Sequence, residues 1–467
     1  MTIFSKIDQN AADHPLHALY ARFRGRLERP DSQDYDALRA LPLANWDRKP
    51  ALIARVADPQ DIAAALEYAR TTGTEVAVRS GGHSTGGFGA CAGGIVIDVR
   101  DLTSLEIAED LSSVWVGSGL TAGEVTLAVE KHGVIVGFGD SATVGVGGLT
   151  VGGGIGYLTR KHGLTIDSLL AVEIVTADGE IIVADADNHP DLFWAVRGGG
   201  GNFGVVTRFR FRLHPLPAFT GGPLVLPATP EVLAGFVAAA EAAPEELTAI
   251  VMVMPAPPMP FLPPQAIGQK VIIGMMAFAG PAEDAARALA PFRALAEPLA
   301  DLVRPAPYSS MYMPEDPNMV PAVSIRTLFV DRIGSREAKA MIDMIDRSDA
   351  PMRMAQIRVL GGAAARIPVD ATAYAHRNNH IVVSYMAMSG PDAIGRNEAW
   401  VDECLEVTSQ GVSGAYVNFL ADEGAARIRD AYPEATWARL RQVKRRYDPD
   451  NLFHLNQNIP PAEADIA

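Results

Sequence analysis

Hydrophobic and polar positions fall in short alternating blocks over the first half of the chain, with strand-like runs followed by helix-like ones. Three runs have the length and apolar alternation of strands: ALIARVA (51–57), EVAVRS (75–80) and GGIVIDVRDL (93–102). Between the first two, Asp58 and Pro59 precede a helical spacing that ends at Gly73, which supplies an N-cap, a first-turn proline and a C-cap. The pattern predicts alternating strands and helices from about residue 50.

Three further segments have specific patterns. The segment 169–185 is apolar on both sides of Asp178-Gly179, which predicts a hairpin. Helical spacing over 17–29, ended by Pro30, predicts a helix in the N-terminal lead-in, and TWARLRQVKRRY (436–447) predicts another near the C-terminus.

Glycine becomes sparse after Pro215, where helical runs such as 231–243 alternate with strand-like runs such as 248–254. This change indicates a second domain. We predict four parts: an N-terminal helical lead-in (1–47), a glycine-rich domain (48–217), a second domain (218–418) and a C-terminal segment (419–467) that returns to the glycine-rich half.

Composition and charge exclude several classes of protein. The chain has 467 residues, 48% of them hydrophobic, and a formal net charge of −15, which argues against a nucleic-acid partner. Two cysteines, Cys91 and Cys404, are too few for a disulfide framework or a multi-cysteine metal site, and no metal-binding motif is present. The first 15 residues lack the pattern of a signal peptide and no apolar run is long enough to span a membrane. We expect a soluble, reduced, cytoplasmic protein without bound metal or a membrane partner.

The glycines point to a ligand site. Of the 43 glycines, a large share lies between Gly81 and Gly204. One G-x-G-x-x-G string starts at Gly199, but the residues after it (VVTRFRFRL) alternate as a strand, whereas a dinucleotide-binding fingerprint requires a helix there. In VRSGGHSTGG (78–87), a strand runs into a glycine turn whose backbone is suited to a phosphate, with His83 at the turn. The alternative role for His83 is a hydrogen bond to its own loop.

Five strings in order resemble one known family: RSGGHS, GGLTVGGGIGYLTRKHGL, DLFWAVRGGGGNFGVVT, AYVNF and YDPDNLFHLNQNIPP. They resemble the berberine bridge enzyme-like flavoproteins of the vanillyl alcohol oxidase superfamily. The resemblance implies an α+β fold in which a two-lobed PCMH-type FAD-binding domain is joined to a substrate domain with an antiparallel sheet covered by helices. It also implies FAD attached covalently through its 8α carbon to His83. Ser141 stands where many relatives have a second tethering cysteine, so a single covalent link is expected.

The resemblance also implies which residues contact FAD. Besides His83, the expected contacts are Arg79, Ser80, Gly81, Gly82, Ser84, Ser141, Thr143, Gly147, Gly148, Gly152, Gly153, Gly154, Gly200, Gly201, Asn202, Val206, Asn456 and Gln457. For some of these glycines the alternative role is turn formation.

Tyr416 and Asn418 are the candidate catalytic residues. Two residues apart in AYVNF, they share a face if the segment is a strand, with Tyr416 as base or substrate orienter and Asn418 as a polar contact. Phe419 replaces the tyrosine usual in the family at that place, which leaves the base open. Val144 matches the small residue that oxidases of the family carry beside the flavin. The candidate substrate-pocket residues are Tyr308, Tyr312, Tyr374, His376, Arg377 and Tyr385, for which the alternative is packing against a sheet.

The expected function is an FAD-dependent oxidase. A C–H bond next to oxygen or nitrogen of a small amine, alcohol or natural-product intermediate gives hydride to flavin N5, and O2 takes the electrons as H2O2. The alternatives are a dehydrogenase with another acceptor, a carbohydrate oxidase, and a flavin-binding protein without turnover. The sequence does not predict the oligomeric state.

Overall fold

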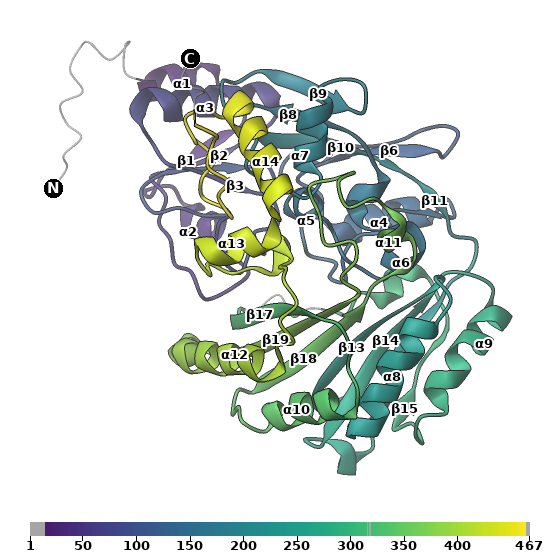
Figure 1. Cartoon of the computed structure of the whole chain (residues 1–467). Helices are drawn as coiled ribbons and strands as arrows, with labels where there is room; N and C mark the ends of the chain where they lie inside the picture. The colour runs from purple at the N-terminus through teal and green to yellow at the C-terminus, as the bar shows by residue number, and fades with distance from the viewer. Residues whose placement is uncertain (1–14, 315, 317–318, 464–467) are drawn as a thin grey trace.

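The computed structural model describes residues 15–314, 316 and 319–463. The first fourteen residues, where no signal peptide is expected, lie outside this range. In Figure 1 the purple and blue elements form the upper half of the molecule, teal and green strands form a large sheet below them, and the yellow helices nearest the C-terminus lie in the upper half.

The predicted alternation from residue 50 forms a four-stranded sheet, in which β2, β4 and β3 are parallel and β1 is antiparallel to β2. The strands in spatial order are β1 (Arg26–Glu28), β2 (Leu52–Arg55), β4 (Ile95–Asp98) and β3 (Val76–Arg79). Helix α3 (Pro59–Thr72) connects β2 to β3. As predicted, the Asp58 side chain accepts from Asp61 N, and Gly73 ends the helix with φ 68°.

The N-terminal helix is shorter than predicted. Helix α1 (Pro15–Arg22) ends before Gly25, and the next residues form β1 instead of a further helical turn. The buried carboxylate of Asp61 explains the change, because it accepts hydrogen bonds from the backbone N–H groups of Arg24 and Gly25 and draws the chain towards β2. A β-carbon at Gly25 would lie 2.0 Å from Arg55 O, so only glycine allows this approach.

A five-stranded antiparallel sheet follows: β5 (Leu105–Ile107), β6 (Ser113–Gly117), β10 (Val205–Arg212), β8 (Leu169–Val175) and β9 (Ile181–Asp185) in spatial order. The hairpin predicted at Asp178-Gly179 connects β8 to β9. Strand β10 directly follows the last glycine run and buries Phe209 and Phe211 while Arg210 and Arg212 are exposed. A strand follows that run, as predicted, so the run lacks the strand–turn–helix context of a Rossmann-type nicotinamide dinucleotide fingerprint.

The remaining elements of this half are short. They are α2 (Tyr35–Arg39), α4 (Ala122–Glu130), β7 (Val134–Ile135), α5 (Val146–Gly152), α6 (Thr159–His162), η2 (Thr165–Ser168), α7 (Pro190–Val196) and β11 (His214–Pro215), which pairs with β7.

The large antiparallel sheet is built from residues 220–389, inside the predicted second domain. Its strands in spatial order are β15 (Ala300–Asp301), β12 (Thr220–Pro227), β14 (Lys270–Phe278), β13 (Leu247–Pro255), β18 (Met352–Val359), β19 (Ile381–Ser389) and β17 (Ala322–Val330), and β16 (Arg304–Pro305) also pairs with β12. Helices lie on its lower face in Figure 1: α8 (Pro230–Ala242), α9 (Ala282–Arg293), α10 (Ser335–Ile345) and α12 (Ile394–Thr408). Buried apolar side chains between sheet and helices form one core cluster, and the other face of the sheet is turned towards the upper half.

The C-terminal elements α13 (Ala425–Ala431) and α14 (Glu434–Tyr447) return to the upper half. The fully buried Lys444 explains how the end is fixed. Its Nζ donates to the carboxylate of Asp448 (2.6 Å) and to the carbonyl oxygens of Asn202 and Phe453. The ammonium group therefore joins the helix, the segment after it and the glycine run before β10.

Among the described residues no helix is both long and apolar enough to cross a membrane.

Candidate functional site

A cavity of about 580 Å³ lies between the glycine-rich half and the upper face of the large sheet. Many of the residues predicted to contact FAD or substrate line it: Arg79, Ser80, Gly81, Gly82, His83, Ser84, Ser141, Val144, Gly147, Gly148, Gly154, Gly200, Gly201, Val206, Tyr416, Asn418, Asn456 and Gln457. The structure thus brings together loops that are separated by more than 300 positions in the chain.

The loop after β3 forms one end of the cavity. Its glycine turn packs directly on a second loop, since a β-carbon at Gly81 would lie 2.4 Å from Gly145 N. Ser80 Oγ donates to Ser118 O at 2.7 Å, and Arg79 donates to the carbonyl oxygens of Leu38 and Ala40. Burial lowers the pKa of Arg79 to about 10, so its positive charge persists at neutral pH beside the predicted phosphate loop.

Two glycines leave open space beside the backbone of the cavity wall. At Gly148, on α5, and at Gly201, after α7, an added β-carbon would meet no protein atom within 4 Å. Both residues line the cavity, so the wall here is bare backbone facing open volume. A flat ring system needs such close approach to the backbone, and the residues present fit FAD in this respect.

Of three neighbouring glycines predicted to contact FAD, two have a different role. A β-carbon at Gly152 would lie 1.9 Å from Asn418 Oδ1, and one at Gly153 would lie 3.1 Å from the Tyr416 ring. Gly152 and Gly153 do not line the cavity. Their lack of side chains makes room for Tyr416 and Asn418, while Gly154 lines the cavity itself.

The segment that carries Tyr416 and Asn418 is not a strand. Residues Val417–Phe419 form a 3-10 turn, η6, so the shared strand face considered for Tyr416 and Asn418 does not apply. The turn still unites the two side chains, because Asn418 Nδ2 donates to the Tyr416 hydroxyl at 3.0 Å. Asn418 also donates to Leu149 O, and Gly154 N donates to the Tyr416 hydroxyl at 2.7 Å.

This environment keeps Tyr416 protonated at neutral pH. Burial raises the pKa of Tyr416 to about 12, although the hydrogen bonds from Asn418 and Gly154 and the charge of Arg358 act in the opposite direction. A base must release its proton near the working pH, so the structure favours an orienting role for Tyr416.

Sequence reasoning missed the part of the site that the large sheet supplies. Alternate residues of β18, Met354, Gln356 and Arg358, line the cavity. Arg358 donates to Asp140 at 2.7 Å, and its guanidinium lies 4.7 Å from the centre of the Phe419 ring. The period-two alternation of MRMAQIRV was the available signal, but it does not show which face meets the other half.

The six residues predicted for the substrate pocket lie outside the cavity lining. Tyr385 faces the opposite side of the sheet and packs on Trp400 of α12, since its neighbours Ser384 and Met386 face the cavity. Tyr308 and Tyr312 pack edge to face, and the Tyr312 hydroxyl lies 3.1 Å from Thr126 Oγ1.

The other three lie behind the Tyr416 segment. Arg377 forms a buried ion pair with Asp167 at 2.7 Å, and His376 Nε2 lies 3.0 Å from Ala431 O. Tyr374 packs edge to face against the Tyr416 ring, with the ring centres 5.9 Å apart, and so supports that residue from behind.

Besides Gly152 and Gly153, two predicted FAD contacts lie outside the lining, Thr143 and Asn202. Thr143 Oγ1 is 3.3 Å from Ser141 Oγ. Asn202 is buried and holds the C-terminal segment, because its side chain donates to Gln457 O and accepts from Ile459 N at 3.0 Å. Asn202 therefore fixes the C-terminal segment to the glycine run from behind the cavity wall. Two more hydrogen bonds hold this segment, because Asn456 donates to Gly201 O and Gln457 donates to Leu420 O.

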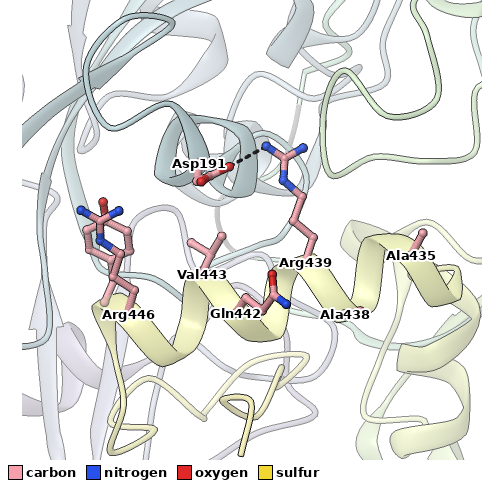
Figure 2. Close-up of a pocket in the computed structure, with 8 residues that line it drawn as sticks. Asp191, Ala435, Ala438, Arg439, Gln442, Val443 and Arg446 are labelled. Carbon is pink, nitrogen blue, oxygen red and sulfur yellow. Dashed lines mark hydrogen bonds and ion pairs between the residues drawn. The ribbon is translucent and has the colours of Figure 1, made fainter. Parts of the chain in front are cut away.

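A second hollow, of about 460 Å³, lies on the surface between α7 and α14 (Figure 2). Arg439 and Arg446 border it, and Arg439 is paired with Asp191 at 2.6 Å. None of the predicted site residues lines this hollow, and it has no glycine wall.

The described residues contain no group of three or more His, Cys, Asp or Glu side chains arranged to hold a metal ion.

Two known family models match parts of this chain. Residues 50–185 match the family model described as an FAD binding domain. The protein is therefore an FAD-linked oxidoreductase, an assignment that its named relatives share. Residues 415–460 match a second model, described as berberine and berberine like. An uncharacterised FAD-linked oxidoreductase of Bacillus subtilis is 30% identical over 467 residues, which cover 94% of this chain and 98% of that protein. The chain belongs to the berberine bridge enzyme-like family.

Other relatives agree. (R)-6-hydroxynicotine oxidase of Paenarthrobacter nicotinovorans is 29% identical over 472 residues, covering 94% of this chain and 97% of that protein. The crystal structure of 6-hydroxy-D-nicotine oxidase from Arthrobacter nicotinovorans has a TM-score of 0.83 at 27% identity and covers 94% of this chain and 98% of that chain. Wild-type BBE-like 1 of Physcomitrella patens has a TM-score of 0.84 at 22% identity, covering 97% of this chain and 100% of that chain, a likeness of fold alone. The predicted α+β fold is confirmed.

Proposed function

We propose that the cavity holds FAD attached to the protein through His83 alone, and that the protein is an oxidase. The observation that carries the proposal is the bare glycine wall at Gly148 and Gly201 in one cavity with His83. Ser141 also lines the cavity, and its hydroxyl lacks the nucleophilic thiolate that a second tether would need.

Bound FAD supplies a two-electron acceptor for hydride from a C–H bond next to oxygen or nitrogen, and O2 takes up these electrons as H2O2. The protein's part is to hold and orient the substrate. Tyr416, protonated and fixed by Gly154 and Asn418, presents a rigid aromatic edge to the cavity. Asp140 is the one carboxylate among the described residues lining the cavity, and it is paired with Arg358.

The remaining ionisable side chains of the cavity leave little capacity to remove a proton. They are Arg79 and Arg358, both cations, and His83, the proposed site of attachment. Substrates that need no strong base, such as amines in their neutral form, therefore suit the site at least as well as alcohols.

A dehydrogenase with another electron acceptor is the second candidate. Val144 lines the cavity, and its small side chain leaves more room beside a bound ring than leucine would. This favours access of O2 and so favours the oxidase.

Reoxidation of the flavin separates the two functions without knowledge of the substrate. The purified protein is reduced with dithionite under anaerobic conditions and mixed with air-saturated buffer, and flavin absorbance is followed. Recovery within seconds, with H2O2 released, supports the oxidase. A reduced flavin that persists for many minutes contradicts it. Val144→Leu is expected to slow recovery, while Val151→Leu, also on the cavity wall, serves as the matched control.

Turnover needs a separate assay. Peroxide release is measured with a panel of amines, alcohols and sugars, and reaction with any of them supports an enzyme. Fast reoxidation combined with no reaction across the panel favours a flavin-binding protein without turnover.

A further inference from the structure

The face of the large sheet that meets the cavity has an ordered pattern of side chains. On β18, Met354, Gln356 and Arg358 point to the cavity in turn, since they are two residues apart. Strand pairing places Met386 of β19 beside Met354, and Ser384 beside Gln356. Each of these three residues of β18 therefore belongs to a row of neighbouring side chains that crosses the sheet from strand to strand.

The first row is apolar and rich in sulfur. It runs from Met354 through Met386 to Ile325 of β17, and Met388 lines the cavity one step further along β19. Methionine side chains are flexible and polarisable and contact aromatic rings favourably. This row forms a surface for a flat apolar body.

The second row contains one polar group without a protein partner. It runs from Met252 of β13 through Gln356 to Ser384. The Ser384 hydroxyl lies 3.0 Å from Thr327 Oγ1, so it has a partner within the sheet. The Gln356 amide is half-buried and forms no hydrogen bond with any described residue, although it lines the cavity.

Arg358 begins the third row and is only partly satisfied. Its side chain is 5% exposed, and one nitrogen, Nη2, donates to Asp140. Its Nε and Nη1 are buried and have no hydrogen-bond partner within the described part of the chain. A buried donor without an acceptor is unfavourable, so a ligand oxygen that reaches the Arg358 guanidinium from the cavity would gain a charge-assisted hydrogen bond.

We propose that this wall selects a substrate with an aromatic body, packed on Met354 and Met386, and one hydrogen-bond-accepting oxygen that faces Gln356 and Arg358. The inference rests on the proposed function and names the substrate class of the same site. An oligosaccharide is a poor match, because each of its many hydroxyl groups needs a partner and the first row offers none. The Asp140 carboxylate neutralises part of the Arg358 charge, so the guanidinium can bind a charged or an uncharged acceptor. The accepting oxygen therefore belongs to a carboxylate, a phenol or a carbonyl.

The test is calorimetric titration of the purified yellow protein with benzoate, benzamide and cellobiose. Benzoate and benzamide share the ring and the oxygen but differ in charge, and cellobiose represents saccharides. We expect both aromatic probes to bind and cellobiose to bind at least tenfold more weakly. Tighter binding of benzoate than of benzamide assigns a carboxylate, and the reverse order assigns a neutral oxygen.

Variants locate the binding on the wall. Arg358→Met removes charge-assisted hydrogen bonds of about 1.5–3 kcal/mol, which corresponds to roughly 10- to 140-fold weaker binding of benzoate. Gln356→Leu is expected to weaken both aromatic probes, and Met386→Ser to weaken both severalfold. Arg353→Met is the matched control on the same strand, since Arg353 donates to Ile345 O and Ala350 O and does not line the cavity.

Two results would overturn the inference: cellobiose binding as tightly as benzoate, or unchanged binding of both aromatic probes in Arg358→Met and Gln356→Leu. Arg358→Lys, which keeps the charge, replaces Arg358→Met if the latter does not fold. Colour separates this failure from failure of the proposed function. A colourless protein contradicts the proposed binding of FAD. A yellow protein that does not bind the aromatic probes contradicts only the proposed substrate class.

Discussion

A substitution at Gly148 distinguishes best between a glycine wall that binds a ligand and a glycine wall that only allows the protein to pack closely. An added β-carbon there meets no protein atom within 4 Å, and the residue has no positive φ that would strain a side chain. Gly148→Leu is therefore expected to fold normally and to place its side chain in the cavity. Because glycine within a helix costs roughly 0.5–1 kcal/mol relative to alanine, the apoprotein loses no stability.

FAD binding responds differently. Extra methyl and methylene groups in a fitted space cost about 1–3 kcal/mol, which corresponds to roughly 5- to 140-fold weaker binding. The assay is FAD titration by fluorescence in a His83→Ala background, where binding is expected to be reversible. Gly395→Leu is the matched control, because Gly395 lies on the exposed side of α12 with equally open space around it.

A Gly148→Leu variant that binds FAD as tightly as Gly395→Leu would refute the assignment of the glycine wall. So would a Gly148→Leu apoprotein that unfolds at much lower denaturant concentration than the control, since the glycine would then be needed for packing. Gly152→Ala provides the contrast, because its β-carbon would meet Asn418 at 1.9 Å and the apoprotein itself is expected to be destabilised.

Three further predictions concern other polar side chains. Lys444→Met leaves the Asp448 carboxylate buried without its cation, so denaturant titration is expected to show a loss of about 3–5 kcal/mol, against less than about 1 kcal/mol for Arg439→Met at an exposed ion pair. Tyr416→Phe removes the acceptor of Gly154 N–H, and the same assay is expected to show a loss of about 1–3 kcal/mol with flavin content unchanged. Burial lowers the pKa of His162 to about 3, below its value of about 6.5 in an unfolded chain. The unfolded chain thus binds the proton first, stability falls as the pH drops from 6.5 towards 3, and His162→Phe is expected to reduce the loss of thermal midpoint between pH 7 and pH 4.5.

Local signals predicted much of the fold. Helix α3 carried its own cap residues, and the hairpin at Asp178-Gly179 carried its own turn residues. The lead-in differed because the decisive group, Asp61, lies 36 positions after Gly25 and captures its backbone N–H. No local pattern in residues 17–29 contains that information.

The site divides in the same way. Contiguous glycine strings identified the loops that line the cavity, because the glycines that such a backbone needs are part of each loop's own sequence. The substrate-side wall depends on which face of each strand meets the other half. Tyr385 and Met386 are adjacent, yet Tyr385 packs on α12 and Met386 lines the cavity. Strand register determines which of the two faces the cavity, and the sequence alone does not reveal that register.

Peptide mass spectrometry decides whether FAD is attached covalently to His83. The purified protein is precipitated with acid, washed, digested and mapped. We expect the yellow colour to stay with the protein and only the peptide that contains His83 to carry the added mass of the flavin, while His83→Ala releases its flavin into the supernatant. Colour that washes entirely from the parent protein, or flavin mass on a peptide without His83, would contradict it.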